Sequence, residues 1–227
     1  MLGLPDGITA CLFDLDGVLT KTAVVHERAW KTTFDEFLGD RGTFEESDYD
    51  DFVDGKPRED GIRDFLASRH IDASEQTVAT LSERKNELVL KLIHDEGVDA
   101  YPGSVSYLKA ARDAGLRRAV VSSSHNCEDV LRVAKLTEYL EVRVDGHVID
   151  ALGLRGKPAP DSFLEGARRL GVRPDQAVVF EDALAGVESG RAGKFGHVVG
   201  VDRVGHRAAL LEHGADVVVD DLAELLR

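Results

Sequence analysis

The sequence predicts an α/β protein: a doubly wound parallel sheet whose first strand is followed by an all-helical insert. Three observations lead to this prediction. Short Val-rich apolar runs recur along the chain, as in parallel strands covered on both faces. Helical patterns alternate with these runs in the second half of the chain. Before them lies a segment of about 75 residues in which we recognise helical patterns but no convincing strand.

The first expected strand is ITACLF, residues 8–13, which follows Pro5, Asp6 and Gly7. The later expected strands are residues 117–122, 177–181, 197–201 and 215–220. Helices are expected at residues 104–115, 161–171, 183–192 and 206–213. The second of these helices carries a Ser162–Glu165 capping box and ends on glycine. A sheet of this class binds ligands at the carboxyl ends of its strands.

The insert contains several expected helices. VVHERAWKTTFDEFL keeps apolar residues near helical spacing, and residues 74–97 repeat the pattern with charges between. Residues 95–103, DEGVDAYPG, form the expected linker back to the sheet. We therefore expect a core domain of residues 1–21 and 97–227, and a helical cap domain of residues 22–96.

Composition limits the classes of partner. The 227 residues are 43% hydrophobic and 31% charged, and 42 acidic against 28 basic residues give a formal charge of -14. This net negative charge does not favour binding to nucleic acid or to an anionic membrane. No apolar run approaches the roughly 20 residues of a membrane span, and the N-terminus lacks the pattern of a secretory signal. We expect a cytoplasmic, monomeric protein that binds a small molecule.

Two carboxylates end the first expected strand in the stretch FDLDGV. Asp14 and Asp16 are two residues apart, so both can face the strand-end crevice while Leu15 points into the core. Two unpaired carboxylates this close repel each other, which implies a cation, a shared proton or a basic partner. The alternative is an aspartate turn that caps the following helix.

Polar residues also follow the other expected strands. SSSHN, residues 122–126, suits an oxyanion, although such residues also cap helices. Glu181 and Asp182 form a second acidic pair, and four carboxylates at one crevice favour Mg²⁺. Lys157, in GLRGKPAPD, is a candidate cation for neutralising phosphate charge. The glycine spacing of that stretch does not match a phosphate-binding P-loop.

The series FDLDGV, VVSSS, GKPAPD and VVFED resembles the four motifs of the haloacid-dehalogenase (HAD) superfamily, and the resemblance covers essentially the whole chain. It implies phosphoryl transfer through an aspartyl phosphate, with Mg²⁺ as the cofactor. The roles that it implies are nucleophile for Asp14, general acid/base for Asp16, phosphate binding for Ser122 and Lys157, and metal binding for Asp14, the Asp16 carbonyl, Asp182 and, in support, Glu181.

Three segments of the insert, TKTAVVHERAWK, VDGKPREDGI and ERKN, resemble the β-phosphoglucomutase subfamily, whose cap is mobile. The resemblance implies that His26 orients Asp16. It also implies substrate binding by Trp30, Gly55, Arg58 and Lys85 of the cap and by Ser123, Ser124, His125 and Asn126 of the core. Each cap residue alone also fits a plain alternative: a solvated histidine, a core tryptophan or an exposed charged loop.

Two residues depart from the mutase pattern. His125 replaces a common lysine, which weakens the grip on a distal phosphate unless the imidazole is protonated. Lys21 replaces a common hinge aspartate, and is either a solvated hinge residue or the partner of an acid in the cap or core.

The resemblance therefore implies a mutase that interconverts β-D-glucose 1-phosphate and glucose 6-phosphate through glucose 1,6-bisphosphate. A sugar-phosphate phosphatase with the same aspartyl-phosphate chemistry is the alternative. A non-catalytic protein of this fold is a third possibility, which the presence of Asp14, Asp16, Lys157 and Asp182 disfavours.

Overall fold

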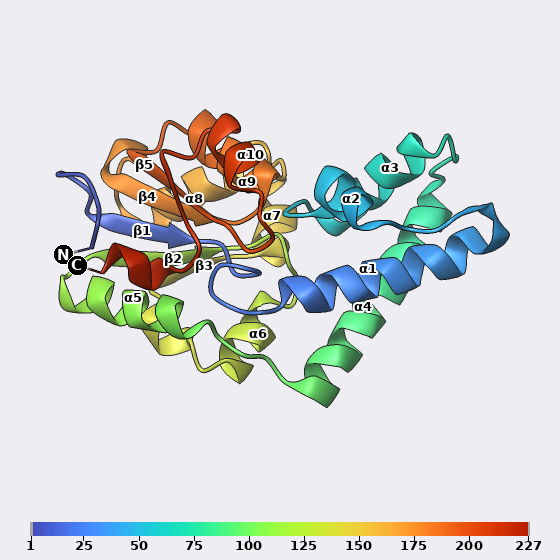
Figure 1. Cartoon of the computed structure of the whole chain (residues 1–227), viewed down its shortest axis with the longest axis horizontal. Helices are drawn as coiled ribbons and strands as arrows, with labels where there is room; N and C mark the ends of the chain where they lie inside the picture. The colour runs from blue at the N-terminus through green and yellow to red at the C-terminus, as the bar shows by residue number, and fades with distance from the viewer. Residues whose placement is uncertain (1, 227) are drawn as a thin grey trace.

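The computed structural model describes residues 2–226 and consists of an α/β core beside a layer of helices (Figure 1). Within the described chain, the core holds a six-stranded parallel sheet in the order β3-β2-β1-β4-β5-β6. The strands are β1 (Ala10–Phe13), β2 (Arg117–Val121), β3 (Val142–Val144), β4 (Ala177–Glu181), β5 (His197–Val201) and β6 (Val217–Val219). The central strand is β1, so the acidic pair that follows it lies in the middle of the sheet edge.

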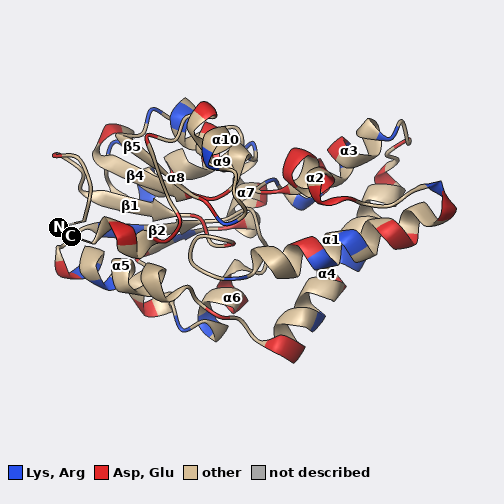
Figure 2. Cartoon of the chain, in the orientation of Figure 1, with Lys and Arg blue, Asp and Glu red and all other residues tan. Residues whose placement is uncertain are grey.

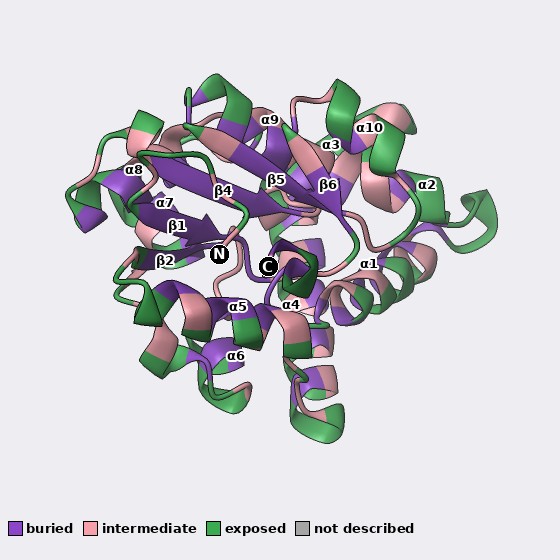
Figure 3. Cartoon of the chain, turned by 60° about the vertical axis from the view of Figure 1, so that its left-hand side comes forward, coloured by how far each residue is buried: buried purple, intermediate pink, exposed green. Residues whose placement is uncertain are grey.

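Helices cover both faces of the sheet, and the strands between them are buried (Figure 3). The core helices are α5 (Pro102–Asp113), α6 (Cys127–Val133), α7 (Gly146–Leu152), α8 (Asp161–Leu170), α9 (Leu184–Ala192) and α10 (Arg207–Glu212). On one face Phe13 stacks on Phe180 with ring centroids 4.6 Å apart. On the other face Leu12 packs in a cluster with Phe163 of α8. Alternate residues of β1 thus anchor the two helical layers.

The second part, which we call the cap, consists of α1 (Ala23–Leu38), α2 (Glu46–Asp48), a π-helical turn (Tyr49–Val53), α3 (Arg58–Ser68) and α4 (Glu75–Glu96). It has its own apolar cluster, in which the Phe34 and Phe65 ring centroids lie 4.1 Å apart. Two chain crossings join the cap to the core, and they pair with each other, since the Lys21 amide donates to the Asp99 carbonyl at 2.9 Å. Residues 22–96 as a separate domain stay a prediction.

The predicted fold class is confirmed, and the later expected strands and helices differ from the observed ones by at most two residues at their ends. Among the core strands and helices, no expected range covered β3, α6 or α7. The capping-box prediction was wrong, because α8 starts after Pro160 without a side-chain cap. Ser162 is buried, and the Glu165 carboxylate instead binds Arg168 at 2.6 Å. In the order of the chain, 3-10 turns complete the structure at Gly39–Arg41, Thr137–Tyr139, Pro174–Gln176 and Leu222–Leu225.

Charged side chains of both signs are mixed over the helices of the core and the cap (Figure 2). Lys21 makes no ion pair with any acid in residues 2–226, and its ammonium lies 5.8 Å from the centre of the Tyr101 ring. The hypothesis that Lys21 pairs with an acid was therefore wrong for this arrangement of the cap. None of the helices in the described range is both long and apolar enough to cross a bilayer.

Candidate functional site

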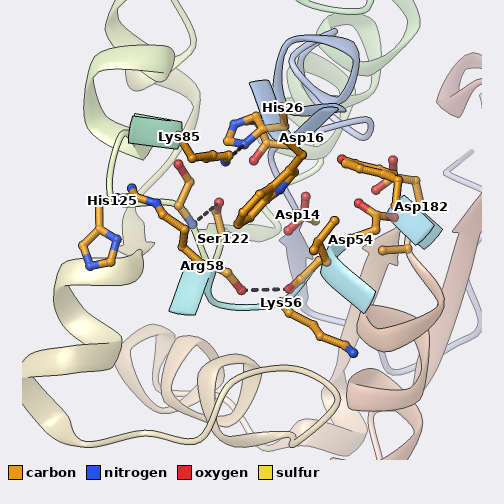
Figure 4. Close-up of a pocket in the computed structure, with 17 residues that line it drawn as sticks. Asp14, Asp16, His26, Asp54, Lys56, Arg58, Lys85, Ser122, His125 and Asp182 are labelled. Carbon is orange, nitrogen blue, oxygen red and sulfur yellow. Dashed lines mark hydrogen bonds and ion pairs between the residues drawn. The ribbon is translucent and has the colours of Figure 1, made fainter. Parts of the chain in front are cut away.

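A pocket lies between the carboxyl ends of the central strands and the cap (Figure 4). The core contributes the turns after β1, β2 and β4. The cap contributes α1, α4 and the segment 53–58, which we call the cap loop and which connects the π-helical turn to α3. Asp14, Asp16 and Asp182 face the same space in Figure 4. The structure therefore brings together side chains from six separate stretches of the chain.

Lys157 joins two buried carboxylates at the floor of the pocket. Its ammonium donates to Asp14 Oδ1 at 2.6 Å and to Glu181 Oε1 at 2.5 Å. Burial alone would lower the pKa of Lys157, but the two carboxylates outweigh burial and raise it, so the ammonium stays charged. Burial raises the pKa of Asp14 well above its usual range, and Lys157 opposes that rise. The buried pair depends on this single ammonium for its charge balance.

The carboxylates at this edge fit a hard cation. Asp14, Glu181 and Asp182 each offer an oxygen, and these oxygens lie within 4.8 Å of one another. Both Glu181 oxygens are occupied, one by Lys157 and one by the Ala183 amide at 3.1 Å, which leaves Glu181 a supporting place. Among residues 2–226 no hydrogen bond or ion pair reaches the Asp182 carboxylate. Oxygen-rich sites of this kind bind divalent cations such as Mg²⁺.

The electrostatic environment of the Asp182 carboxylate favours the binding of such a cation. Burial raises its pKa well above the usual range, and the nearby Asp54 and Glu181 carboxylates raise it further. Gly17 makes the close approach possible, because a Cβ at that position would lie 1.6 Å from Asp182 Oδ2. A bound cation would relieve a repulsion that the protein leaves uncompensated.

The start of the cap supplies the contacts of the Asp16 side chain. The Thr22 hydroxyl donates to Asp16 Oδ1, and His26 Nε2 lies 3.4 Å from the same oxygen. Burial would raise the pKa of Asp16, but His26 and Thr22 lower it to about 2. Asp16 is therefore ionised at neutral pH.

A second contact fixes the orientation of His26. Lys85 Nζ lies 2.7 Å from His26 Nδ1 and 4.7 Å from the centre of the Trp30 ring. Burial and then Lys85 lower the pKa of His26, which favours the neutral ring. Burial and Arg58 lower the pKa of Lys85 to about 7. A neutral His26 that accepts from Lys85 at Nδ1 carries its proton on Nε2, directed at Asp16.

The turn after β2 divides its hydroxyls between two tasks. Ser122 Oγ accepts from the Ser124 amide at 3.1 Å, and Ser124 Oγ accepts from the Asn126 amide at 3.2 Å, so both shape the turn. Ser123 Oγ instead donates to the carbonyl of Gly55 in the cap loop at 2.9 Å. Ser123 was predicted to bind substrate, and the structure shows its hydroxyl on the cap.

The far end of the pocket holds a polar bridge between cap and core. Asn86 Oδ1 in α4 accepts from Arg58 at 2.9 Å and from the Asn126 side chain at 3.0 Å. His125 lines the pocket, but its Nε2 lies 2.7 Å from Asp150 Oδ2 of α7. One ring nitrogen of His125 is therefore already paired with a core carboxylate.

Sequence reasoning missed several residues of the pocket. Those that line it are Tyr49, Val53, Asp54, Lys56 and Ala183, and Asn86 lies behind its far end. Burial and then Glu181 raise the pKa of Asp54 to about 7. Lys56 lies in the same loop but points away from the site in Figure 4, and it pairs with Asp64 at 2.7 Å. The sequence signal for Asp54 and Asn86 was their position in VDGKPREDGI and ERKN, the two segments that resemble the mutase cap.

Known proteins with similar sequences identify the family of this chain. The family model described as haloacid dehalogenase-like hydrolase matches residues 8–194. A β-phosphoglucomutase of Mycobacterium bovis is 51% identical over 247 aligned positions, which cover 100% of this chain and 94% of that protein. Hexitol phosphatase A of Escherichia coli is 31% identical, with 94% of this chain and 91% of that protein covered.

Among solved structures, a β-phosphoglucomutase from Clostridium difficile superposes with a TM-score of 0.82 at 26% identity. The match covers 96% of this chain and 93% of that one. The chain thus matches family members along both its core and its helical cap. It belongs to the haloacid dehalogenase superfamily and, within it, to the β-phosphoglucomutase-like group.

Proposed function

We propose that this protein is a Mg²⁺-dependent β-phosphoglucomutase, which interconverts β-D-glucose 1-phosphate and glucose 6-phosphate. The M. bovis relative of that name and the four motifs support the proposal. The observation that carries it is the pair of polar ends in one covered pocket. Asp14 and Ser122 line one end, where Lys157 bonds Asp14. Arg58 lines the other end and is linked to Asn126 through Asn86. A substrate phosphorylated at both ends needs both sets.

In the first half of the reaction, Asp14 carries the phosphoryl group as an aspartyl phosphate. A sugar hydroxyl attacks phosphorus, the bond from phosphorus to the Asp14 oxygen breaks, and the hydroxyl proton passes to Asp16. The low pKa of Asp16 keeps it ionised for this step. The product in the pocket is glucose 1,6-bisphosphate.

In the second half, the bisphosphate turns round and presents its other phosphate to Asp14. The Asp14 carboxylate attacks phosphorus, and Asp16 returns its proton to the leaving sugar oxygen. Lys157, 2.6 Å from Asp14, offsets the negative charge that gathers at the attacking oxygen. His26 keeps the Asp16 carboxylate in place through both halves.

The carboxylates Asp14 and Asp182, with the Asp16 carbonyl and the support of Glu181, would hold Mg²⁺. When bound, this ion would neutralise phosphoryl oxygens and lower the repulsion between phosphate and the attacking carboxylate.

The test is a coupled assay for glucose 6-phosphate formed from β-glucose 1-phosphate, with Mg²⁺ and a trace of glucose 1,6-bisphosphate, while free phosphate is followed in parallel. We expect isomerisation with little phosphate release, and its loss in Asp14→Asn, which keeps the side-chain shape but removes the nucleophile. Lys21→Asp is a matched control on the exposed linker and should retain activity. Phosphate release without isomerisation would refute the mutase and identify a sugar-phosphate phosphatase.

A further inference from the structure

The cap loop rests on the core at a few defined points. Gly55, with a φ of +70°, lies so close to the turn after β4 that a Cβ there would be 2.9 Å from Ala183 Cβ. A Cβ on Gly156 would lie 2.1 Å from Pro57 Cγ, so the second contact is equally tight. Both contacts are apolar or backbone packing, which carries little directional preference. They allow the loop to sit on the core without fixing its position along the surface.

The Ser123 hydroxyl supplies the directional contact. It donates to the Gly55 carbonyl at 2.9 Å, between residues that are 68 positions apart in the chain. Its neighbours Ser122 and Ser124 use their hydroxyls within the turn itself. Among the three serines, Ser123 is therefore the one that links the turn after β2 to the cap.

The bond between Ser123 and Gly55 controls the access of water to the reacting groups, because the cap loop lies over the pocket. Gly55 and its neighbour Asp54 both line the pocket that holds Asp14 and Asp16. If the loop lifts, water reaches the aspartyl phosphate. Water then attacks phosphorus and its proton goes to Asp16. The bond to the Asp14 oxygen breaks, and inorganic phosphate leaves with the Asp14 carboxylate regenerated.

We propose that Ser123 is a positioning residue that, by latching the cap loop through the Gly55 carbonyl, sets the ratio between phosphoryl transfer to sugar and hydrolysis by water. This inference rests on the proposed aspartyl-phosphate function and names a residue that limits the loss of the phosphoryl group to water. It assigns Ser123 to closure of the cap, in place of the substrate contact predicted from sequence.

The experiment compares Ser123→Ala with Ser189→Ala. Ser189 Oγ donates to the Ala159 carbonyl at 2.8 Å within the core, so the control removes a bond of the same kind away from the cap. Free phosphate and glucose 6-phosphate are measured in the same reaction. In Ser123→Ala the ratio of phosphate release to isomerisation should rise about twofold to tenfold, the factor for one neutral hydrogen bond. The ratio should stay at the wild-type value in Ser189→Ala, and Ser123→Thr, which keeps the hydroxyl, should restore it.

A second readout does not depend on activity. Trp30 is the only tryptophan, is 3% exposed and lines the pocket, so its quenching by acrylamide reports how often the cap opens. Quenching should increase in Ser123→Ala and not in Ser189→Ala. An unchanged ratio, an unchanged quenching constant, or an equal loss of both reactions would overturn the latch. If the wild type does not isomerise the sugar phosphate, the proposed function fails, while the quenching comparison still tests the contact.

Discussion

Replacing Asp54 by asparagine is expected to reduce the pH dependence of cap closure in the metal-free protein. Asp54 is carried by the cap loop, and in the closed arrangement its carboxylate faces the core acids (Figure 4). Burial and then Glu181 raise its pKa from the ordinary 3.8 to about 7. Opening the cap returns this carboxyl to water and to its ordinary pKa. Closure and protonation of Asp54 are therefore linked.

The sign and size follow from these two pKa values. Below about pH 4 Asp54 is protonated in both states and costs nothing. As the pH rises towards 7 only the open state loses its proton, so closure becomes less favourable. Above pH 7 the full cost applies, and a rise from 3.8 to about 7 corresponds to about 4 kcal/mol. Because water enters the pocket and screens the charge, we expect about 1–3 kcal/mol.

The assay is acrylamide quenching of Trp30 in EDTA at a series of pH values from about 5 to 8, a range that brackets the raised pKa. In the wild type quenching should increase with pH, and in Asp54→Asn the increase should be much smaller. Asp51→Asn removes an exposed acid close to the cap loop and should follow the wild type. If Asp54→Asn kept the wild-type pH profile, the assignment of this charge to closure would be wrong.

Three further changes test the site and the cap. Lys157→Met leaves two buried carboxylates without their cation and should lower the free energy of unfolding by about 3–5 kcal/mol, measured by urea unfolding followed by circular dichroism. Thr22→Val removes the hydroxyl that donates to Asp16, so the pKa of Asp16 should rise and the acid limb of the kcat/KM profile should move to higher pH. An unmoved limb would contradict that role. Phe34→Ala empties the middle of the cap cluster and should cost about 3–5 kcal/mol, with faster hydrogen exchange in α1 and α3 but not in the sheet.

The core was predictable because its signals are local. Val-rich runs mark strands wherever both faces of a sheet are covered, and parallel strands place their carboxyl ends at one edge. That rule alone brings Asp14 and Asp182 together, although 167 residues lie between them. Strand β3 was not predicted because it has only three residues, two of them partly exposed, so no apolar run marks it. The Ser162 capping box failed because the sequence pattern matched while Pro160 already starts the helix.

The cap residues were less predictable because their roles depend on where the cap rests. Lys56 and Asp54 stand two positions apart in one charged loop, and nothing in that stretch says which of them enters the site. Both residues line the pocket, but the Asp54 carboxylate faces the site while the Lys56 ammonium pairs with Asp64. Ser123 shows the same limit, since its neighbours shape a turn while its own hydroxyl meets a carbonyl from the other part of the molecule.

Adjacent residues of the cap loop act on closure in opposite directions. The Gly55 carbonyl accepts the Ser123 bond, a neutral contact whose net contribution is about 1 kcal/mol. One residue earlier, Asp54 places a carboxylate near the core acids, where it adds to the rise in the pKa of Asp182. At neutral pH the combined cost of burying an ionised Asp54 beside these acids, about 1–3 kcal/mol, is comparable to or larger than the contribution of one neutral hydrogen bond, and it favours opening of the metal-free cap. A divalent cation held by Asp182 would cancel the repulsion and leave the latch sufficient. Cation binding and cap closure would then favour each other. The cap would therefore exclude water when the cation that neutralises the reacting phosphate is in place.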